Sequence, residues 1–297
     1  MQRNLLLRHK RQKLNEGELI ESFHKIIATF PHDIVERGIN RNWMQYVFIL
    51  KKLYPFLCLL PDDGQICDIG AGAAIVPLAM AQLGFGVSLV DRWSEYATDL
   101  DNQMGTLDDF VSRFRQFGVN YYSCDFMTER IPLANESQDL VSAFSVLEHL
   151  PRPSIVLDEI RRLLKPGGLV VILLPNTANL QNRIRLLLGK SPHPHHWKDF
   201  YSHTFFGHYR ELTRKELREV FEHEGYEILA LHASNSSQTN TKRSRGKWGK
   251  GWNPESLNQL IRGLYLLTVA LHPSLRYDLL LIARKPGGAE ASRQGDA

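Results

Sequence analysis

The sequence predicts an α/β fold with a mostly parallel sheet and helices on both faces. Three features of the 297 residues support this fold: short apolar runs that end in an acid, helical segments between them, and a glycine turn after the first run. Strands that alternate with helices in this way form parallel sheets. With 43% hydrophobic and 23% charged residues, the chain can bury one large core and carry additional structure around it.

The first part of the chain, residues 1–62, is predicted to form an N-terminal helical cap. Helical patterns occur at 17–30 and 42–59, and the sequence Pro-Asp-Asp-Gly at 61–64 is a turn signal. We expect the cap to pack over a ligand site in the core, which runs from 63 to 176.

The first strand and its glycine turn occupy residues 65–74 (QICDIGAGAA). Gly70 and Gly72 carry no Cβ, so the backbone at these positions is able to approach a ligand closely. An Ala-rich helix is expected at 75–84. This order of strand, tight turn and helix is typical of a nucleotide-type site at the carboxyl edge of a sheet.

The second strand, at 86–91, ends at Asp91, about twenty residues after the first glycine. A carboxylate at this position accepts hydrogen bonds from ribose hydroxyls in dinucleotide folds. The pattern leaves dinucleotides and adenosyl cofactors both open. The remaining strands are predicted at 121–126, 139–150, 226–232 and 278–283, with one more within 163–176. In that segment Lys-Pro-Gly-Gly at 165–168 is expected to close a helix, and a buried strand follows and ends at 175–176.

The rest of the chain, residues 177–285, is predicted to hold an acceptor lid, the last two strands and an insertion between them. Thr213 with Glu216 three positions later forms a capping box, which predicts the start of a helix. Residues 234–253 are polar and basic and lead into an apolar helical stretch. The polar tail at 286–297 is expected to be disordered.

Five ordered motifs carry a family resemblance: DIGAG, VD, CDF, DLVSAFSVLEHL and LLKPGG, within residues 65–176. Together they resemble the class I S-adenosylmethionine-dependent methyltransferases, in particular the small-molecule branch that includes the ubiquinone-biosynthesis O-methyltransferases. The resemblance implies a Rossmann-like, seven-stranded sheet whose last two strands form a reversed hairpin. Ala74 stands where the family often has a third glycine, and it is small enough to keep the turn.

The resemblance also implies the cofactor contacts. Asp68, Gly70 and Gly72 would meet the methionine portion of S-adenosylmethionine, with the Gly70 carbonyl accepting from its amino group. Asp91 would bind the ribose. The alternative is that the acids only cap or solvate the strand ends, although acids at three successive strand tips favour a functional site.

The adenine and sulfonium contacts would come from the neighbouring strands. Arg92 would lie along the adenine, and Asp125, with the backbone of Phe126, would accept from the adenine amino group. Phe144 and Ser145 would lie beside the sulfonium at the end of the fourth strand.

Two histidines are candidates for a general base. His149 follows the fourth strand directly, and a histidine pKa near 6.5 suits proton transfer. Glu148 beside it is interpreted as pocket-shaping or structural. His208 belongs to the phrase HYRELT, which resembles an H-x-R-x-[FYL]-T phrase of the same family that faces the active site. Arg210 in this phrase is predicted to contact an anion or to form a structural ion pair.

The segment 191–210 is rich in histidines and aromatic residues and allows two interpretations. One is a metal site, but two of its histidines are adjacent and no H-x-x-x-H repeat is present, so no metal is predicted. The other is a lid over an apolar acceptor pocket. The histidines of this segment, besides His208, are His193, His195, His196 and His203. The aromatic residues expected to line the pocket are Trp197, Phe200, Tyr201 and Tyr209.

The predicted function is methyl transfer to a small-molecule, lipid-linked or sugar acceptor, preferably on oxygen. The chain lacks the N-P-P-Y phrase, the Pro-Cys nucleophile and the double-glutamate loop of other methyltransferase groups. Transfer to nitrogen or carbon remains an alternative, as does a non-catalytic scaffold that binds the cofactor. A nicotinamide dehydrogenase fits poorly, because D-x-G-x-G differs from the dinucleotide fingerprint G-x-G-x-x-G.

The net charge and the cysteine content give predictions about the binding partners and the cellular compartment of the protein. A net charge of +4 gives no support for a dedicated nucleic-acid binder. Three cysteines without zinc-type spacing indicate buried thiols in a reducing cytosol, and neither a secretory signal nor a transmembrane span is predicted. The basic residues and tryptophans in 242–271 are interpreted as a solvated loop, as a peripheral membrane or anion contact, or as an RNA contact. The oligomeric state is not predicted.

Overall fold

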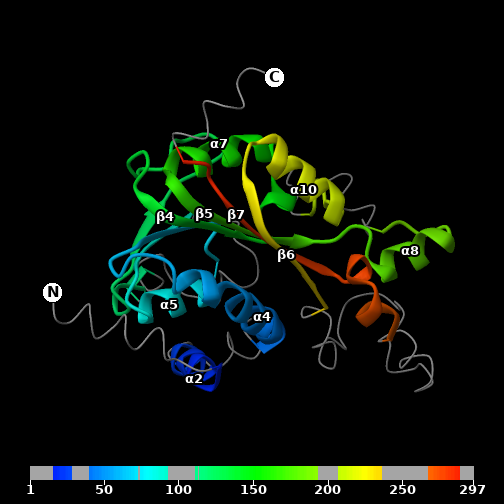
Figure 1. The fold of residues 1–297 in the computed structure, drawn as a ribbon, viewed down its shortest axis with the longest axis horizontal. Coiled ribbons are helices and arrows are strands. Elements are labelled where there is room, and N and C mark those ends of the chain that lie inside the picture. Colours follow the sequence, from blue (N-terminus) through cyan, green and yellow to red (C-terminus); the bar gives the residue numbers. More distant parts are fainter. Residues whose placement is uncertain are drawn as a thin grey trace.

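A seven-stranded sheet forms the centre of the fold. The computed structural model describes residues 16–28, 40–72, 74–92, 111–112, 114–192, 207–235 and 267–287. The strands are β1 (Gln65–Ile69), β2 (Gly86–Asp91), β3 (Asn120–Ser123), β4 (Gln138–Phe144), β5 (Leu164–Pro175), β6 (Glu227–Ser234) and β7 (Asp278–Arg284). They lie in the order β3-β2-β1-β4-β5-β7-β6, and β7 is antiparallel to both of its neighbours. The predicted α/β class with a mostly parallel Rossmann-like sheet is therefore confirmed (Figure 1).

Helices cover both faces of the sheet (Figure 1). Within the described ranges they are α2 (Glu16–Ile27), α4 (Asn40–Leu57), α5 (Ile75–Gln82), α7 (Pro153–Leu163), α8 (Leu180–Leu187) and α10 (Arg214–His223), with short 3-10 turns η3 (Leu147–His149) and η6 (Pro273–Leu275). Side chains of α4 and α5 belong to the core on one face, and those of α7 and α10 to the core on the other. None of the described helices is long and apolar enough to cross a bilayer.

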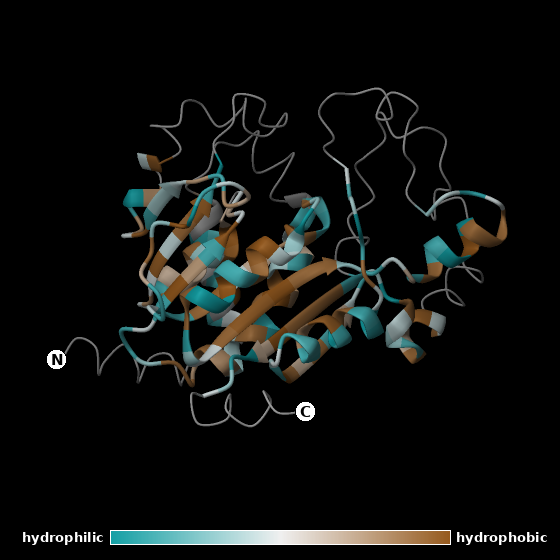
Figure 2. Ribbon diagram, turned by 90° about the horizontal axis from the view of Figure 1, so that it is seen from above, coloured by the Kyte–Doolittle hydropathy of each residue, from teal (hydrophilic) through white to brown (hydrophobic). Residues whose placement is uncertain are grey.

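The apolar pattern of β7 explains why it lies between two strands with a helix layer on each side. Leu279 and Leu281 belong to one core cluster, whereas Leu280 and Ile282 belong to the other. Successive side chains of a strand point to opposite faces, so a continuous apolar run is stable only where both faces are covered. Figure 2 shows that the inner strands are the most hydrophobic part of the sheet.

Three predicted boundaries were wrong. The third strand ends at Ser123, because the Asp125 carbonyl accepts hydrogen bonds from two following backbone N–H groups and forms a turn. The fourth strand ends at Phe144, since Ser145 adopts a positive φ of 55° and η3 follows. The Lys-Pro-Gly-Gly segment does not close α7. It lies within β5, where the pairing with β4 changes register.

The capping box predicted for α10 is confirmed. The backbone N–H of Glu216 donates to Thr213 Oγ1 (3.2 Å), and that of Thr213 donates to Glu216 Oε2 (2.8 Å). Both bonds satisfy backbone donors that a helix start otherwise leaves without partners.

The amino edge of the sheet is held together by charged side chains. Asp139 Oδ2 accepts from the backbone N–H of Gln65 (2.8 Å) and from Lys165 Nζ (2.7 Å). Lys285 Nζ donates to the carbonyl oxygens of Arg161 (2.9 Å) and Leu164 (2.8 Å) at the end of α7. These charge-assisted hydrogen bonds join β1, β4, β5 and the segment after β7.

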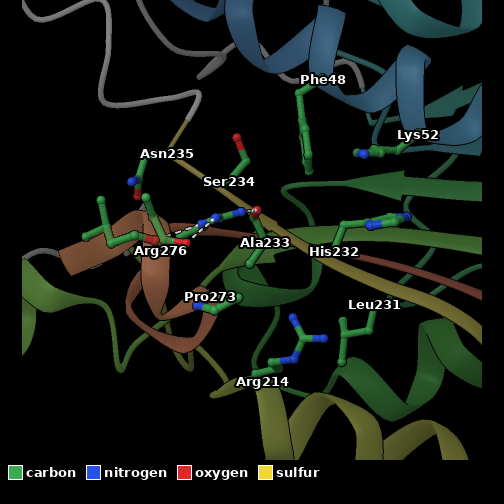
Figure 3. A pocket seen from close by; sticks show the side chains of 12 residues that line it. Phe48, Lys52, Arg214, Leu231, His232, Ala233, Ser234, Asn235, Pro273 and Arg276 are labelled. Atoms are coloured by element: carbon green, nitrogen blue, oxygen red, sulfur yellow. Dashed lines mark hydrogen bonds between the residues drawn. The ribbon is translucent and has the colours of Figure 1, made fainter. Parts of the chain in front are cut away.

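The opposite edge carries the carboxyl ends of β1, β2, β4, β5 and β6. At the end of β6 a cavity of about 530 Å³ opens beside α4 and η6 (Figure 3). The glycine turn after β1 lies at the same edge.

Candidate active site

The glycine turn lies where the strand order changes direction, because β1 has β2 on one side and β4 on the other. In open α/β sheets, ligands bind outside the carboxyl ends of the strands at such a switch point. The fold thus brings the predicted residues Asp68, Gly70 and Gly72 to the edge where a ligand is expected.

The backbone of this turn depends on its glycines. Gly70 has φ +71°, donates its N–H to the Val90 carbonyl (2.8 Å), and leaves no room for a Cβ because Val146 lies against it. Gly72 has φ +47° and faces open space. Ala74 also adopts a left-handed conformation, with φ 52°, which costs about 1 kcal/mol for a residue with a Cβ. The turn therefore keeps its course without a third glycine.

Asp68 is a buried carboxylate beneath the turn. It is 2% exposed, and the hydroxyl of the buried Ser142 on β4 donates to its Oδ1. Burial raises the pKa of Asp68 to about 8, and the Asp91 carboxylate adds to the rise. No lysine or arginine of the described chain forms an ion pair with it. A cation bound at this position would therefore stabilise the ionised carboxylate and lower its pKa.

Asp91 fixes the turn to the end of β2. Its Oδ2 accepts from the Gly72 N–H (2.8 Å), and its Oδ1 accepts from the Arg92 N–H (2.8 Å). Arg92 Nη1 lies 3.2 Å from Asp125 Oδ2, so the two residues expected at the adenine form an exposed ion pair. Sequence reasoning missed this pair, which has no signal in the spacing of the two residues.

The other predicted contact residues lie at the ends of β3 and β4. Phe126 is buried in the turn after β3 and belongs to the core. Phe144 is half-buried as the last residue of β4. Ser145, with its positive φ, donates its N–H to the Leu173 carbonyl (2.8 Å), which holds the strained residue against β5.

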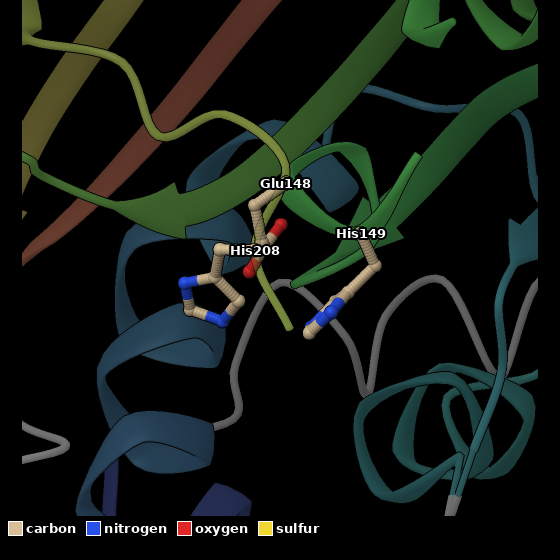
Figure 4. Close-up of side chains that lie close together, drawn as sticks. All are labelled: Glu148, His149 and His208. Atoms are coloured by element: carbon tan, nitrogen blue, oxygen red, sulfur yellow. The ribbon is translucent and has the colours of Figure 1, made fainter. Parts of the chain in front are cut away.

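Glu148, His149 and His208 form a cluster beyond β4 (Figure 4). One potential ligand atom from each residue lies within 4.8 Å of the others. The two imidazole rings meet edge to face at 4.7 Å. A set of two histidines and one carboxylate is able to transfer protons or to hold a divalent cation.

The surroundings shift the pKa values of the two histidines in opposite directions. Burial lowers the pKa of His149, and the charge of His208 lowers it further. Nδ1 of His149 lies 3.2 Å from the Gly207 carbonyl oxygen and donates to it in one tautomer, which leaves Nε2 as an acceptor. A hydrogen bond from His208 Nδ1 to Glu211 raises the pKa of His208. Burial raises the pKa of Glu148 to about 7, and its Oε2 has no hydrogen-bond partner among the residues that the structure describes.

The backbone holds the two histidines together. The Tyr209 N–H donates to the Glu148 carbonyl oxygen (2.7 Å), so the segment before α10 is fastened to η3. Sequence reasoning missed Glu211, although its position three residues after His208 was a usable signal. Arg210 lies 3.8 Å from Glu216 in an exposed ion pair, as one of its two predicted roles requires.

The remaining predicted lid and loop residues lie outside the described ranges. These are His193, His195, His196, Trp197, Phe200, Tyr201 and His203, together with residues 288–297 of the tail and most of the basic segment 242–271.

Comparisons with known proteins identify the family. A family model described as a methyltransferase domain matches residues 41–231, more than half of the chain. The chain belongs to this methyltransferase family. The resemblance to class I S-adenosylmethionine-dependent methyltransferases is thereby confirmed.

Relatives of this methyltransferase domain include two ubiquinone biosynthesis O-methyltransferases. That of Colwellia psychrerythraea is 32% identical over 109 residues, which cover 36% of this chain and 40% of the relative. That of Pseudomonas aeruginosa is 32% identical over 114 residues, covering 36% and 43%. The chain thus matches about two fifths of the length of these curated relatives.

A solved structure with the same fold is phosphoethanolamine N-methyltransferase 2 of Haemonchus contortus, in complex with phosphomonomethylethanolamine and S-adenosylhomocysteine. It is 17% identical, with a TM-score of 0.50, and the match covers 82% of this chain and 53% of that one. At this identity, the likeness concerns the fold alone.

Proposed function

We propose that this domain is an S-adenosylmethionine-dependent methyltransferase that binds its cofactor at the carboxyl ends of β1, β2 and β4. The observation that carries the proposal is Asp68, a buried carboxylate with a raised pKa and no cationic partner in the described chain. The cofactor carries an ammonium group, which would be the cationic partner that Asp68 lacks in the described chain. The open space at Gly72 allows the ligand to approach the turn.

The other cofactor contacts follow from the same edge. The Asp91 carboxylate accepts the backbone N–H groups of Gly72 and Arg92, and a carboxylate has about four lone-pair sites. Ribose hydroxyls are suitable donors for these sites. Arg92 and Asp125 would flank the adenine, with Phe126 in the turn behind it and Phe144 and Ser145 at the methyl end.

When bound, S-adenosylmethionine supplies an electrophilic methyl group on a sulfonium centre. The protein's part is to orient the acceptor and to remove its proton. His149 is suited to accept this proton, because its surroundings favour the neutral ring and its Nε2 forms no hydrogen bond with the described residues. His208, held by Glu211, would position His149 through their edge-to-face contact.

We propose oxygen as the acceptor atom in a small, lipid-linked or sugar substrate. The names of the two curated relatives support oxygen, and a histidine base suits a hydroxyl group whose proton must leave. Nitrogen or carbon acceptors remain alternatives. Cytoplasmic action, with or without peripheral membrane contact, accords with the three free cysteines, two of which are buried.

Calorimetric titration with S-adenosylmethionine, S-adenosylhomocysteine and NAD tests the proposal. We expect affinity on the order of micromolar for the two adenosyl compounds and no heat with NAD. Asp91→Ala should abolish binding because the ribose acceptor is lost, whereas Asp158→Ala on the exposed surface of α7 should not change it.

Absence of adenosyl binding, or unchanged affinity in Asp91→Ala, would contradict the cofactor assignment. Binding without methyl transfer to any hydroxyl acceptor would favour the scaffold alternative.

A further inference from the structure

The cavity at the end of β6 is lined by basic side chains from four segments. Lys52 comes from α4, His232 from β6, Arg214 from the start of α10, and Arg276 from the residue after η6 (Figure 3). The remaining lining residues include Phe48 and Ser234, and no aspartate or glutamate is among those described. A volume of about 530 Å³ lies within the range of small-ligand sites.

The positive groups of this pocket repel one another. Burial lowers the pKa of Arg214, and the charges of Arg218 and Arg276 lower it further. Burial likewise lowers the pKa of His232, with Lys52 and Arg214 as further causes. In both cases every charged neighbour that contributes is cationic, so a bound anion would relieve the repulsion.

Arg276 builds the wall of the pocket. Its guanidinium donates to the carbonyl oxygens of Val269 (2.9 Å), Ala270 (3.0 Å) and Ala233 (3.0 Å). These bonds fasten the segment before η6 to the end of β6. Arg276 therefore contributes charge and shape, and its replacement would disturb the fold.

Lys52 and Arg214, in contrast, have no hydrogen bond or ion pair within the described part of the chain. Arg214 occupies the first position of α10, where the helix dipole favours an acid and disfavours a cation. Helix stability therefore does not explain a cation at this position.

We propose that this pocket binds the phosphate group of a phosphate monoester or diester. Guanidinium and ammonium groups that converge from different elements match a tetrahedral anion with several acceptor oxygens. The site is independent of the cofactor assignment, and it lies at the same carboxyl edge of the sheet. Ser234, which lines the pocket, lies opposite Asp278 in the pairing of β6 with β7. The charge of Asp278 in turn contributes to the raised pKa of Glu148 in the histidine cluster.

Titration calorimetry of the full chain with glycerol 3-phosphate, a phosphate monoester, tests the soluble source of this group. Cosedimentation with phosphatidylcholine vesicles, with and without phosphatidylglycerol, tests the lipid headgroup. We expect Arg214→Gln and Lys52→Gln each to weaken binding at least tenfold in whichever arm shows it. Lys52 is exposed, so its variant keeps the fold.

Arg284→Gln is the matched control. It removes the same charge at the other end of β7, roughly 20 Å along the strand, and breaks only an ion pair with Glu227. S-adenosylmethionine affinity should be the same in all three variants, which separates this site from the cofactor site. The proposal is overturned if no probe binds, if neither pocket variant weakens binding, or if the Arg284 variant weakens it equally.

Discussion

The buried charge of Asp68 is proposed to serve cofactor binding, yet it lowers the stability of the fold. With its pKa raised to about 8, the carboxyl group stabilises the fold fully only below its unfolded pKa near 4, and this contribution is lost as the pH rises through 8. Asp68→Asn keeps an acceptor for Ser142 but removes the charge. We expect the variant to lose cofactor affinity, yet to be more stable than the wild type by roughly 1 to 3 kcal/mol at pH 8.

Urea denaturation without cofactor at pH 5 and pH 8 measures this effect, and the advantage should grow with pH. Asp139→Asn is the matched control, because Asp139 is paired with Lys165 and the same substitution should destabilise the protein. A less stable Asp68→Asn at pH 8 would show that the buried charge is compensated.

The histidine pair predicts a specific pH profile. Since burial and His208 lower the pKa of His149, the rate of methyl transfer should rise with pH and reach half its plateau below pH 6.5. His149→Ala should lower the rate by about 10²- to 10⁴-fold. His208→Gln removes the neighbouring positive charge and should move the rising limb to higher pH. An unchanged limb in His149→Ala would assign the base elsewhere.

Chelation separates a proton-transfer cluster from a metal centre. The hydrogen bond to Glu211 favours the imidazolium form of His208, which has no lone pair for a metal. We therefore expect methyl transfer to survive dialysis against EDTA. A loss of activity that added Zn²⁺ or Mg²⁺ restores would instead make Glu148, His149 and His208 metal ligands.

At the scale of elements, the two glycines of the turn after β1 should differ in how much stability an alanine substitution costs. Gly70→Ala combines a left-handed backbone with a collision against Val146 and should cost about 2 to 4 kcal/mol. Gly72→Ala meets no atom and should cost about 1 kcal/mol from backbone strain alone. Urea denaturation of both variants measures the difference. Equal losses would mean that Val146 moves away at little cost.

The elements were predictable where one local cause decides them. The apolar run of β2 and the capping box of α10 act through neighbouring residues, and both lie as expected. The Lys-Pro-Gly-Gly segment was misassigned because its conformation depends on pairing with β4 and on the bond from Lys165 to Asp139. Such long-range partners leave no mark on local sequence.

At the scale of the whole molecule, order along the chain predicted the sheet and which residues meet at its carboxyl edge. Strand tips gather there whatever the loops do, so Asp68 and Asp91 were identifiable at this edge, and Asp125 lies in the turn that follows β3. The contact between His149 and His208 and the ion pair between Arg92 and Asp125 join different loops. Their geometry depends on packing, which the linear pattern does not contain.

The charged bonds of Asp139 and Lys285 have a consequence for engineering. They fasten the sheet at the edge opposite the glycine turn and the histidines. These bonds therefore lie away from the residues that we propose for cofactor binding and proton transfer. A library that varies residues around Lys165 and Lys285 should therefore yield variants of higher thermal stability with unchanged acceptor specificity. Residues at the carboxyl edge can then be varied separately to select for new acceptors.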